Sequence, residues 1–430
     1  MICNNITINE QGHLCFAGQD VCALAEEYGT PLYLMDEAKI RENCRIYKKA
    51  MERYFDNALP AYASKAAAFK RMYEIVGEEG LGIDVVSVGE IYTAMKAGMS
   101  LENAYFHSNN KTDFDVEFAI KNGVGYFVVD NEEELFAIER INKGNAKKQK
   151  VLLRLTPGID THTYEAVNTG KVDSKFGSAI ETGQAEEITR LALAMDDIEL
   201  MGFHCHIGSQ VFDSDTFLRG SEIMLGFAAD MKEKYGYELK ELSLGGGYGV
   251  KYVESDPEID IDANIKEVAD CIKATCAKLG LTVPKMIMEP GRSIVADAGM
   301  TLYSVGTIKR IPGYKNYISV DGGMTDNPRF ALYGSEYTLF IANRANAEAD
   351  FTADVVGRCC ESGDIIQPDV RLPQPLRGDI VAVCTTGAYN YSMASNYNRV
   401  ERPAVVMLNE GKSYIAVKRE SLDDLIANDV

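Results

Sequence analysis

One pattern constrains the fold of this chain more than any other: a short apolar run ends in a polar residue or a glycine, and a helical segment follows. The eight apolar runs of this kind end at Lys65, Ser87, His107, Asp130, Arg154 or Leu155, His206, Gly245 and Glu289. Strands that alternate with helices indicate a parallel sheet, and eight of them predict its closure into a TIM-type barrel. We therefore predict an α/β fold built on a (β/α)8 barrel. An insertion at 156–176 is expected to form a mobile loop over its mouth.

The segments after about Pro290 have a different pattern. Helical periodicity is largely absent there, and short apolar runs between turn residues take its place. The expected strands are 301–308, 317–320, 351–356, 380–384, 404–407 and 414–417. This pattern predicts an antiparallel β-domain, a sandwich or a barrel, that also takes in the strands at the start of the chain. The predicted domains are thus a barrel over 36–290 and a β-domain made of 1–35 and 291–430.

The composition fits a protein with a large core and a small-molecule substrate. The chain has 430 residues, of which 46% are hydrophobic, and a formal net charge of −20. This excess of acid disfavours nucleic acid and anionic membranes as partners. The first residues, MICNNITINEQG, have neither a basic start nor an apolar stretch, and no apolar run reaches the ~18 residues of a membrane helix. We expect a soluble protein of the cytoplasm.

The ten cysteines lack the spacing of a disulfide framework or of a zinc site. Cys205 and Cys384 lie in strand-like segments, and Cys359 and Cys360 are adjacent. Reduced thiols are the better interpretation of this pattern, and no bound metal is expected.

Lys65 lies at the carboxyl end of the first predicted barrel strand, in the sequence YASKA. This edge is where α/β enzymes keep their chemistry. An amine that its neighbours partly desolvate has a lowered pKa and can attack a carbonyl carbon to form an imine. The alternative is a lysine that extends its amine into solvent, which is the commoner case for a single lysine.

Three further motifs follow barrel strands. His206 and Ser209 belong to HIGSQ, where a flat imidazole can lie against an aromatic ring and the serine can reach a phosphate, although a core histidine is the alternative. GGGYG at 245–249 offers backbone N–H groups to an anion, or forms an ordinary tight turn. Glu289 and Arg292 flank the turn EPGR, which a surface ion pair would also explain. Together, an amine, a ring, phosphate donors and a carboxylate are what pyridoxal phosphate requires.

These motifs and two others resemble those of a known family. YASKA, HIGSQ, GGGYG and EPGR, together with CESGD at 360–364 and GAY at 387–389, are similar to motifs of the diaminopimelate decarboxylases. That family consists of fold type III pyridoxal phosphate enzymes, like the alanine racemases and ornithine decarboxylases. The motifs occur in the family's order from about Leu32 to Tyr397. One departure is Ser108, which stands where a glycine is expected. The resemblance implies that the barrel binds pyridoxal 5′-phosphate.

The resemblance also implies a role for each matching residue at the cofactor. Lys65 matches the catalytic lysine that forms the imine. Glu289 matches the acid that keeps the pyridine nitrogen protonated and the ring a strong electron sink. His206 matches the residue that stacks on the ring. The other cofactor-binding residues implied are Asp84, Ser209, Gly246, Gly247, Gly291, Arg292 and Tyr389. A helix-approach cap explains Asp84 equally well.

A second set of matching residues concerns the substrate. The substrate-binding residues implied are Arg292, Arg329, Tyr333, Glu361 and Tyr389. An arginine fork suits a carboxylate, although a solvated basic surface is the alternative. Glu361 matches the residue that holds the distal ammonium, and Cys360 matches the catalytic acid that protonates the carbanion. In the family both come from the partner subunit of a homodimer. The adjacent Cys359 leaves open which thiol is the donor.

The activity that the resemblance implies is the decarboxylation of meso-2,6-diaminopimelate to L-lysine and carbon dioxide, the last step of lysine biosynthesis. A homodimer with shared active sites would carry it out as a carboxy-lyase. Two alternatives remain open. One keeps the cofactor and changes the substrate to ornithine, lysine, arginine or carboxynorspermidine. The other is a catalytically silent relative that has kept the fold, although such a protein would usually lack the lysine or the thiol.

Overall fold

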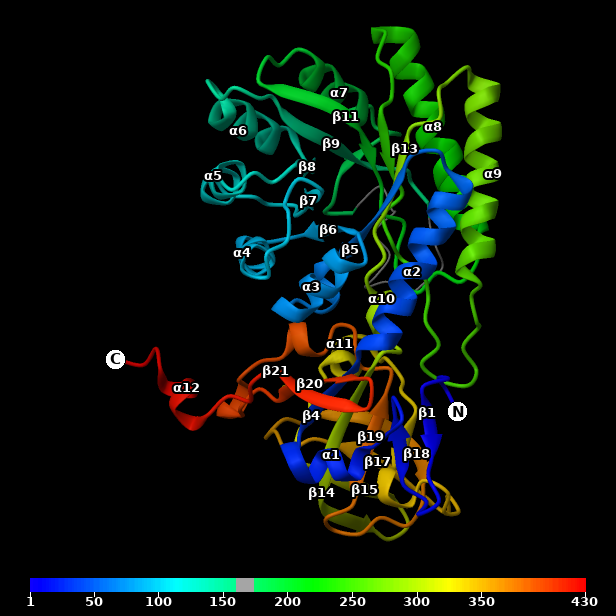
Figure 1. The fold of residues 1–430 in the computed structure, drawn as a ribbon, viewed down its shortest axis with the longest axis vertical. Helices are drawn as coiled ribbons and strands as arrows, with labels where there is room; N and C mark the ends of the chain where they lie inside the picture. The colour runs from blue at the N-terminus through cyan, green and yellow to red at the C-terminus, as the bar shows by residue number, and fades with distance from the viewer. Residues whose placement is uncertain (160–173) are drawn as a thin grey trace. The chain divides into compact units, whose positions relative to one another are not determined.

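The computed structural model describes residues 1–159 and 174–430 and divides them into two compact units (Figure 1). The first unit, the barrel unit, comprises residues 43–249 and 258–291. The second, the β unit, comprises 1–42, 250–257 and 292–430. Most of the loop expected at 156–176 lies outside the described residues. Within the described part of the chain, every helix is too short or too polar to cross a membrane.

Eight parallel strands close into a barrel, as predicted. They are β5 (Ala58–Ala63), β6 (Gly82–Val85), β7 (Ala104–Phe106), β8 (Tyr126–Val129), β9 (Gln149–Thr156), β11 (Ile198–His204), β12 (Glu241–Ser243) and β13 (Lys285–Met288). The hydrogen-bonded order is β9-β11-β12-β13-β5-β6-β7-β8, and the pairing of β8 with β9 closes the ring. A short strand, β10 (Ser178–Ala179), adds to β9.

Helices follow the barrel strands and cover the outside of the sheet (Figure 1). They are α3 (Lys70–Glu78), α4 (Val88–Lys96), α5 (Asp113–Lys121), α6 (Glu132–Asn142), α7 (Gln184–Leu193), α8 (Asp215–Tyr235) and α9 (Ile261–Leu279). Side-chain caps define where several of them begin. Ser87 and Asn131, for example, each accept a hydrogen bond from the backbone N–H three residues later.

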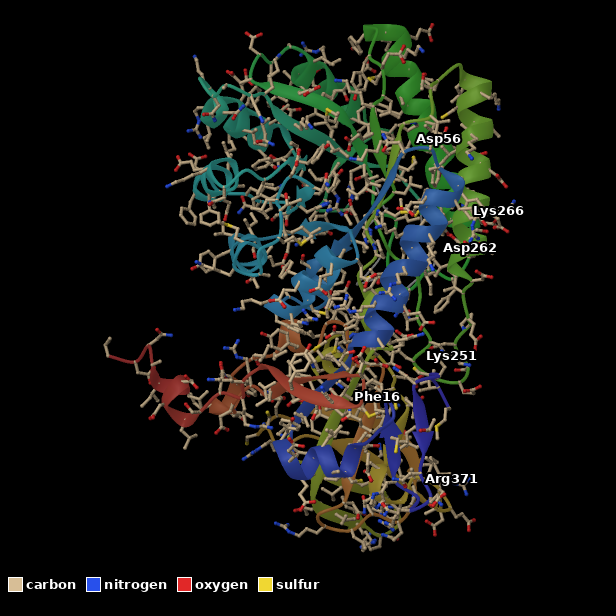
Figure 2. The ribbon with its side chains drawn as sticks, viewed as in Figure 1. Phe16, Asp56, Lys251, Asp262, Lys266 and Arg371 are labelled. Carbon is tan, nitrogen blue, oxygen red and sulfur yellow. The ribbon has the colours of Figure 1, made fainter. Side chains whose placement is uncertain are left out.

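The helix α2 (Glu37–Tyr54) leads into β5, and its end lies beside α9 (Figure 1). Asp36 accepts a hydrogen bond from the Lys39 N–H, as expected of a residue that caps this helix. Near the end of α2, the Arg53 guanidinium lies 2.9 Å from the Asp262 carboxylate. Asp262 and Lys266 are one turn apart on the exposed side of α9 (Figure 2).

The amino-terminal end of the barrel is closed by a polar cluster over an apolar layer. The Tyr105 and Tyr126 rings stack with their centroids 4.5 Å apart. Their hydroxyls donate to the Glu241 carboxylate at 3.2 Å and 3.0 Å, and the Lys285 amine lies 3.4 Å from it. This buried carboxylate therefore has a cation as its partner, which is how a buried acid is normally stabilised.

The β unit is built on one large sheet, whose order is β18-β17-β15-β14-β4-β20-β21, with β19 also paired to β14 and β16 to β19. Its strands are β4 (Leu32–Asp36), β14 (Gly299–Ile311), β15 (Lys315–Val320), β16 (Leu339–Ile341), β17 (Phe351–Val356), β18 (Ile365–Leu372), β19 (Ile380–Cys384), β20 (Ala404–Asn409) and β21 (Lys412–Val417). The sheet is mixed, because β4 with β20 and β15 with β17 are parallel pairs. The β-domain is confirmed, but it is not antiparallel throughout.

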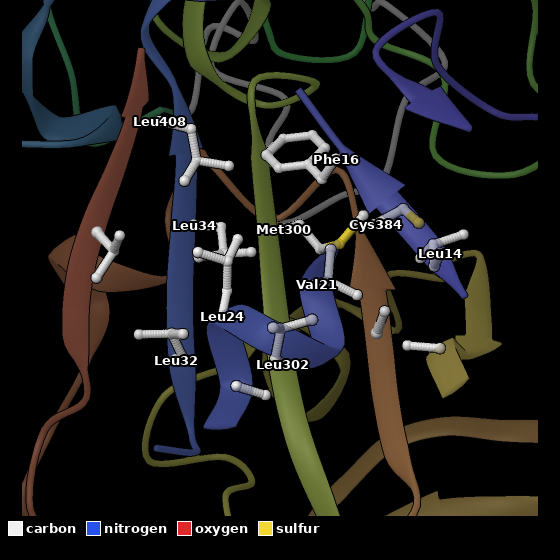
Figure 3. Packing of buried hydrophobic residues seen from close by; sticks show 14 of the residues in the cluster. Leu14, Phe16, Val21, Leu24, Leu32, Leu34, Met300, Leu302, Cys384 and Leu408 are labelled. Atoms are coloured by element: carbon white, nitrogen blue, oxygen red, sulfur yellow. The ribbon is translucent and has the colours of Figure 1, made fainter. Parts of the chain in front are cut away.

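The start of the chain contributes to the core of the β unit. A small sheet of β1 (Ile6–Ile8), β2 (Leu14–Phe16) and β3 (Gln19–Asp20) precedes the helix α1 (Val21–Tyr28). Phe16, Val21 and Leu24 lie over the large sheet and pack with Leu34 and Met300 (Figure 3). All five side chains are buried. This packing explains why the first strands belong to the β unit.

Three short helices complete the β unit. They are α10 (Arg292–Val295), α11 (Arg329–Tyr333) and α12 (Leu422–Ile426). The first two carry arginines that the sequence predicts to bind substrate.

Candidate functional site

Five buried polar residues gather at the carboxyl-terminal end of the barrel. Asp84 belongs to β6, His107 follows β7, His204 ends β11, Ser243 ends β12 and Glu289 follows β13. Each is at most 6% exposed. Because all the strands are parallel, their carboxyl ends meet at one edge of the barrel. That edge is where the sequence predicts the site.

Glu289 is held at both of its carboxylate oxygens. The Ser243 hydroxyl donates to Oε1 at 2.8 Å, and His204 Nε2 lies 2.9 Å from Oε2. His107 Nε2 is 3.4 Å from Oε1. Burial by itself raises the pKa of Glu289, but His204 and His107 outweigh it and hold the pKa well below its ordinary value. The group is therefore a carboxylate at neutral pH.

Asp84 lies near the same histidine but has the opposite electrostatic balance. Its Oδ1 is 3.7 Å from His107 Nε2. Burial raises the pKa of Asp84, and the charges of His107 and Lys65 only partly oppose this effect. The two acids of the site thus have pKa values that are pushed apart, an arrangement that is typical of sites in which two carboxyl groups have different roles.

Lys65 lies in a short 3-10 turn, Ser64–Ala66, immediately after β5. Its neighbours Ser64 and Ala66 are fully buried, whereas the Lys65 side chain is exposed. The sequence predicts that the Lys65 amine is partly desolvated, but the chain by itself leaves this side chain exposed. The strand β5 ends at Ala63, so Lys65 belongs to the turn and not to the strand. The positive charge of Lys65 nevertheless reaches the site, since it lowers the pKa of Asp84.

His206 lies two residues beyond the end of β11 and is half-buried. Its surroundings lower the pKa of this imidazole well below its ordinary value, first through desolvation and then through the charges of Lys65 and Arg154. This flat ring is therefore neutral, and it lies near enough to Lys65 for the charge of the amine to affect it.

The glycine turn, residues 245–247, lies against His206 and the end of β13. A Cβ atom on Gly246 would stand 2.1 Å from the Glu289 carbonyl oxygen, and one on Gly247 would stand 2.3 Å from the Gly208 carbonyl oxygen. Gly247 also has a φ of +113°, which side chains other than glycine rarely adopt. Glycine is thus required at both positions, and backbone atoms of the turn approach the site closely.

Two other predicted positions border this end of the barrel. A Cβ atom on Gly291 would lie 2.9 Å from the Ala63 Cβ, so a small residue is needed where β13 and β5 meet. Ser108, which replaces an expected glycine, has a φ of +135°. This is a conformation that favours glycine. The carbonyl of Ser108 accepts a hydrogen bond from the buried Lys111 amine at 3.1 Å.

In the β unit, two arginines converge on one tyrosine. Arg292 Nη1 donates to the Tyr252 hydroxyl at 2.8 Å, and the Arg329 guanidinium lies 4.8 Å from the centroid of the Tyr252 ring. Burial raises the pKa of Tyr252, but the two arginines outweigh it and lower the pKa. Arg329 also donates to the Tyr337 hydroxyl at 2.9 Å, and Arg292 lies 4.9 Å from the Tyr389 ring. Arg292, Arg329 and Tyr337 thus contact Tyr252, and Tyr389 contacts Arg292.

The remaining predicted residues of the β unit lie nearer to solvent. Tyr333 ends α11 and is half-buried. Cys360 and Glu361 are exposed in the connection between β17 and β18. Cys359 is half-buried, and burial together with Asp364 raises the pKa of its thiol to about 11. The two adjacent thiols therefore have different surroundings.

The barrel residues fit pyridoxal phosphate. Asp84 Oδ1, His107 Nε2 and His204 Nδ1 are buried and lack a hydrogen-bond partner among the described residues, which is typical of a site that receives a ligand. Beside them are an amine, a neutral flat ring, an ionised carboxylate and a turn that admits only glycine. These are the groups that a phosphorylated pyridine aldehyde would use.

The sequence interpretation missed several residues of the site. His204 could have been found, because residues two apart on a strand point to the same side, and His206 was already a candidate. Ser243 belonged to none of the motifs, and His107 was identified as the end of a strand without a role in the site. In the β unit, Tyr252 and Tyr337 were missed because only the fold brings them to the arginines.

The chain is similar in sequence and in fold to proteins of known function. Residues 37–296 match the family described as pyridoxal-dependent decarboxylase, pyridoxal binding domain. The diaminopimelate decarboxylase of Staphylococcus aureus (strain COL) is 44% identical over 428 residues, which cover 99% of this chain and 99% of that protein. That of Bacillus subtilis (strain 168) is 43% identical over 422 residues, with coverages of 98% and 96%. The solved structure of diaminopimelate decarboxylase from M. jannaschii in complex with L-lysine has a TM-score of 0.91 at 33% identity, and the match covers 99% of this chain and 98% of that chain.

Proposed function

Because this chain belongs to the diaminopimelate decarboxylases, we infer that it converts meso-2,6-diaminopimelate to L-lysine and carbon dioxide, the last step of lysine biosynthesis. It is a carboxy-lyase that uses pyridoxal 5′-phosphate. The observation that carries this proposal is the ionised Glu289 at the barrel end that also holds Lys65, since loss of carbon dioxide requires a strong electron sink. The M. jannaschii relative was solved with L-lysine, the product of this reaction.

The barrel residues hold the cofactor. When bound, pyridoxal phosphate accepts the electron pair of the carbon–carbon bond that breaks. Lys65 would hold the aldehyde group through its amine. His206 would stack on the ring, and because this imidazole is neutral it would not repel a protonated pyridine. Glu289 keeps the proton on the ring nitrogen, and Ser209 with the glycine turn binds the phosphate. The other residues proposed to hold the cofactor are Asp84, Gly246, Gly247, Gly291, Arg292 and Tyr389.

The β unit recognises the substrate. We assign Arg292 and Arg329 to its carboxylate, because both guanidiniums are buried and oriented by tyrosine hydroxyls. Tyr333 and Tyr389 complete this part of the site with their hydroxyl groups. In this proposal, 36–290 supplies most of the residues for the cofactor, whereas 291–430 supplies the residues for the substrate together with Gly291, Arg292 and Tyr389 for the cofactor.

The proposal includes a homodimer with shared active sites. Cys360 and Glu361 are exposed in a connection between two strands, so both can enter the site of a second subunit. There Glu361 binds the distal ammonium of the substrate, and Cys360 donates the proton that replaces carbon dioxide. All ten cysteines are free, which supports a location in the reducing cytoplasm.

An assay of carbon dioxide release tests the function. The protein with added pyridoxal phosphate should release carbon dioxide from meso-diaminopimelate and form L-lysine, and Lys65→Ala should lose this activity. Lys266→Ala, which removes an exposed lysine of α9, is the matched control and should keep it. Activity with ornithine, lysine or arginine but not with diaminopimelate would overturn the assigned substrate.

A further inference from the structure

Glu289 differs from two other buried acids of the barrel, Glu241 and Glu134, which are both paired with a lysine. Within the described residues, the ion-pair partners of Glu289 are the histidines His204 and His107. A buried carboxylate without a lysine or an arginine depends on hydrogen bonds for its stability. The donors to Glu289 thus decide its orientation and its charge.

His204 donates its single N–H group to Glu289. The ring is 1% exposed, and burial lowers its pKa to about 4, so it is neutral at pH 7. A neutral imidazole has one N–H, and His204 Nδ1 has no hydrogen-bond partner among the described residues. We therefore assign the proton to Nε2, which lies 2.9 Å from Glu289 Oε2. Among the described residues, the hydrogen bond of this ring is the one to the Glu289 carboxylate.

Ser243 supplies the second donor from the next strand. Its hydroxyl, which is fully buried, donates to Glu289 Oε1 at 2.8 Å. His204 and Ser243 are direct neighbours in the register of β11 and β12, and Ser243 is the neighbour of Ile287 in β13. The backbone ladder already joins these three strands. The side-chain bonds are therefore not needed to pair the strands, and they fix the carboxylate.

We propose that His204 and Ser243 are positioning residues, which hold Glu289 as an oriented carboxylate so that it accepts the proton-bearing ring nitrogen of the cofactor. The inference rests on the proposed function. A carboxylate has about four acceptor positions on its two oxygens. His204 and Ser243 fill one position on each oxygen, so Glu289 keeps the capacity for a third donor. Without them, the carboxyl group would be free to rotate and to take up the proton itself.

The test compares two ligands that differ at one atom. Full-length protein stripped of cofactor is titrated with pyridoxal phosphate and with its deaza analogue, in which a C–H group replaces the ring nitrogen. His204→Leu should weaken the binding of pyridoxal phosphate about tenfold or more, because a charge-assisted hydrogen-bond network is lost. It should leave the binding of the deaza analogue within about twofold of the wild type, since that ligand has no N–H for Glu289. Ser243→Ala should act in the same direction.

Two further variants separate positioning from structural damage. His204→Gln restores a donor near the position of Nε2 and should recover most of the affinity for pyridoxal phosphate. Tyr126→Phe removes a hydrogen bond from the buried Glu241 at the other end of the barrel and should affect both ligands equally. With 15N-labelled cofactor, the ring nitrogen of His204→Leu should shift toward the unprotonated form, which Tyr126→Phe should not cause.

The outcomes distinguish the possible failures. If His204→Leu and Ser243→Ala weaken both ligands equally, or neither, the positioning role is wrong. If His204→Leu does not fold, Ser243→Ala alone decides by the same criterion. If the wild-type protein does not bind pyridoxal phosphate at all, the proposed function itself is wrong, and with it the positioning role.

Discussion

Glu289 and Asp84 are both buried carboxyl groups near His107, yet their surroundings move their pKa values in opposite directions. Cys359 and Cys360 show the same principle in the β unit. The first thiol is half-buried and its pKa is raised to about 11, whereas the second is exposed. The side-chain type alone therefore does not determine the role of a residue, and its neighbours do.

The two thiols give the prediction at the scale of single residues. Cys360→Ser should lower kcat for diaminopimelate about a hundredfold or more, because an accessible general acid is lost. Cys359→Ser should leave kcat nearly unchanged, since its thiol is half-buried against Asp364. Steady-state kinetics of both variants checks this. If the larger loss occurs in Cys359→Ser, the proton donor is assigned to the wrong cysteine.

At the scale of secondary-structure elements, the first turn of α4 contains a carboxyl group whose pKa is raised. Glu90 accepts a hydrogen bond from the Val86 N–H at 2.8 Å. Burial and the nearby Asp84 raise its pKa from 4.5 to about 7, although the Val86 bond opposes them. The folded state therefore binds this proton more tightly than the unfolded state does. The stability that the group contributes is complete below pH 4.5 and is lost as the pH rises to about 7.

Glu90→Gln should remove this dependence. The amide keeps an acceptor for the Val86 N–H and does not titrate. The free energy of unfolding of the variant should therefore rise relative to that of the wild type by about 3 kcal/mol as the pH rises through this window. Urea unfolding of both proteins at a series of pH values measures the difference. Glu254→Gln, whose side chain in the wild type is 85% exposed, is the control and should show no such trend. A difference between Glu90→Gln and the wild type that is the same at every pH would contradict the argument.

At the same scale, the sequence predicts the barrel strands well because each ends in a polar residue or a glycine after an apolar run. It fails for β18, where Pro368 in the middle of the run indicates a turn. It also fails to give the parallel pairing of β4 with β20, which joins segments more than 360 residues apart. The roles of Ser243 and His204 depend on closure of the barrel, which sets β11, β12 and β13 side by side. The local sequence pattern does not show which strands become neighbours when the barrel closes.

For the whole molecule, the proposed shared site makes a prediction about mixed subunits. Lys65→Ala and Cys360→Ala each inactivate one component of the site. If Lys65 and Cys360 of a site come from different subunits, a mixed dimer of the two variants has one intact site and one doubly altered site. Random mixing at equal amounts should then restore about a quarter of the wild-type activity, since half of the dimers are mixed. Activity after dissociation and reassociation of the variants measures this. No recovery would show that both residues of a site come from one subunit, provided that mixed dimers are detected by mass.

The place of β4 in the large sheet has a consequence for the synthesis of the protein. This strand leaves the ribosome early, but its hydrogen-bonded neighbours β14 and β20 lie at 299–311 and 404–409. All eight barrel strands have emerged by then. The nascent barrel can therefore fold first, at a time when the apolar side chains of the first strands are still uncovered. Until β14 and β20 emerge, the apolar side chains of β4 are therefore open to aggregation.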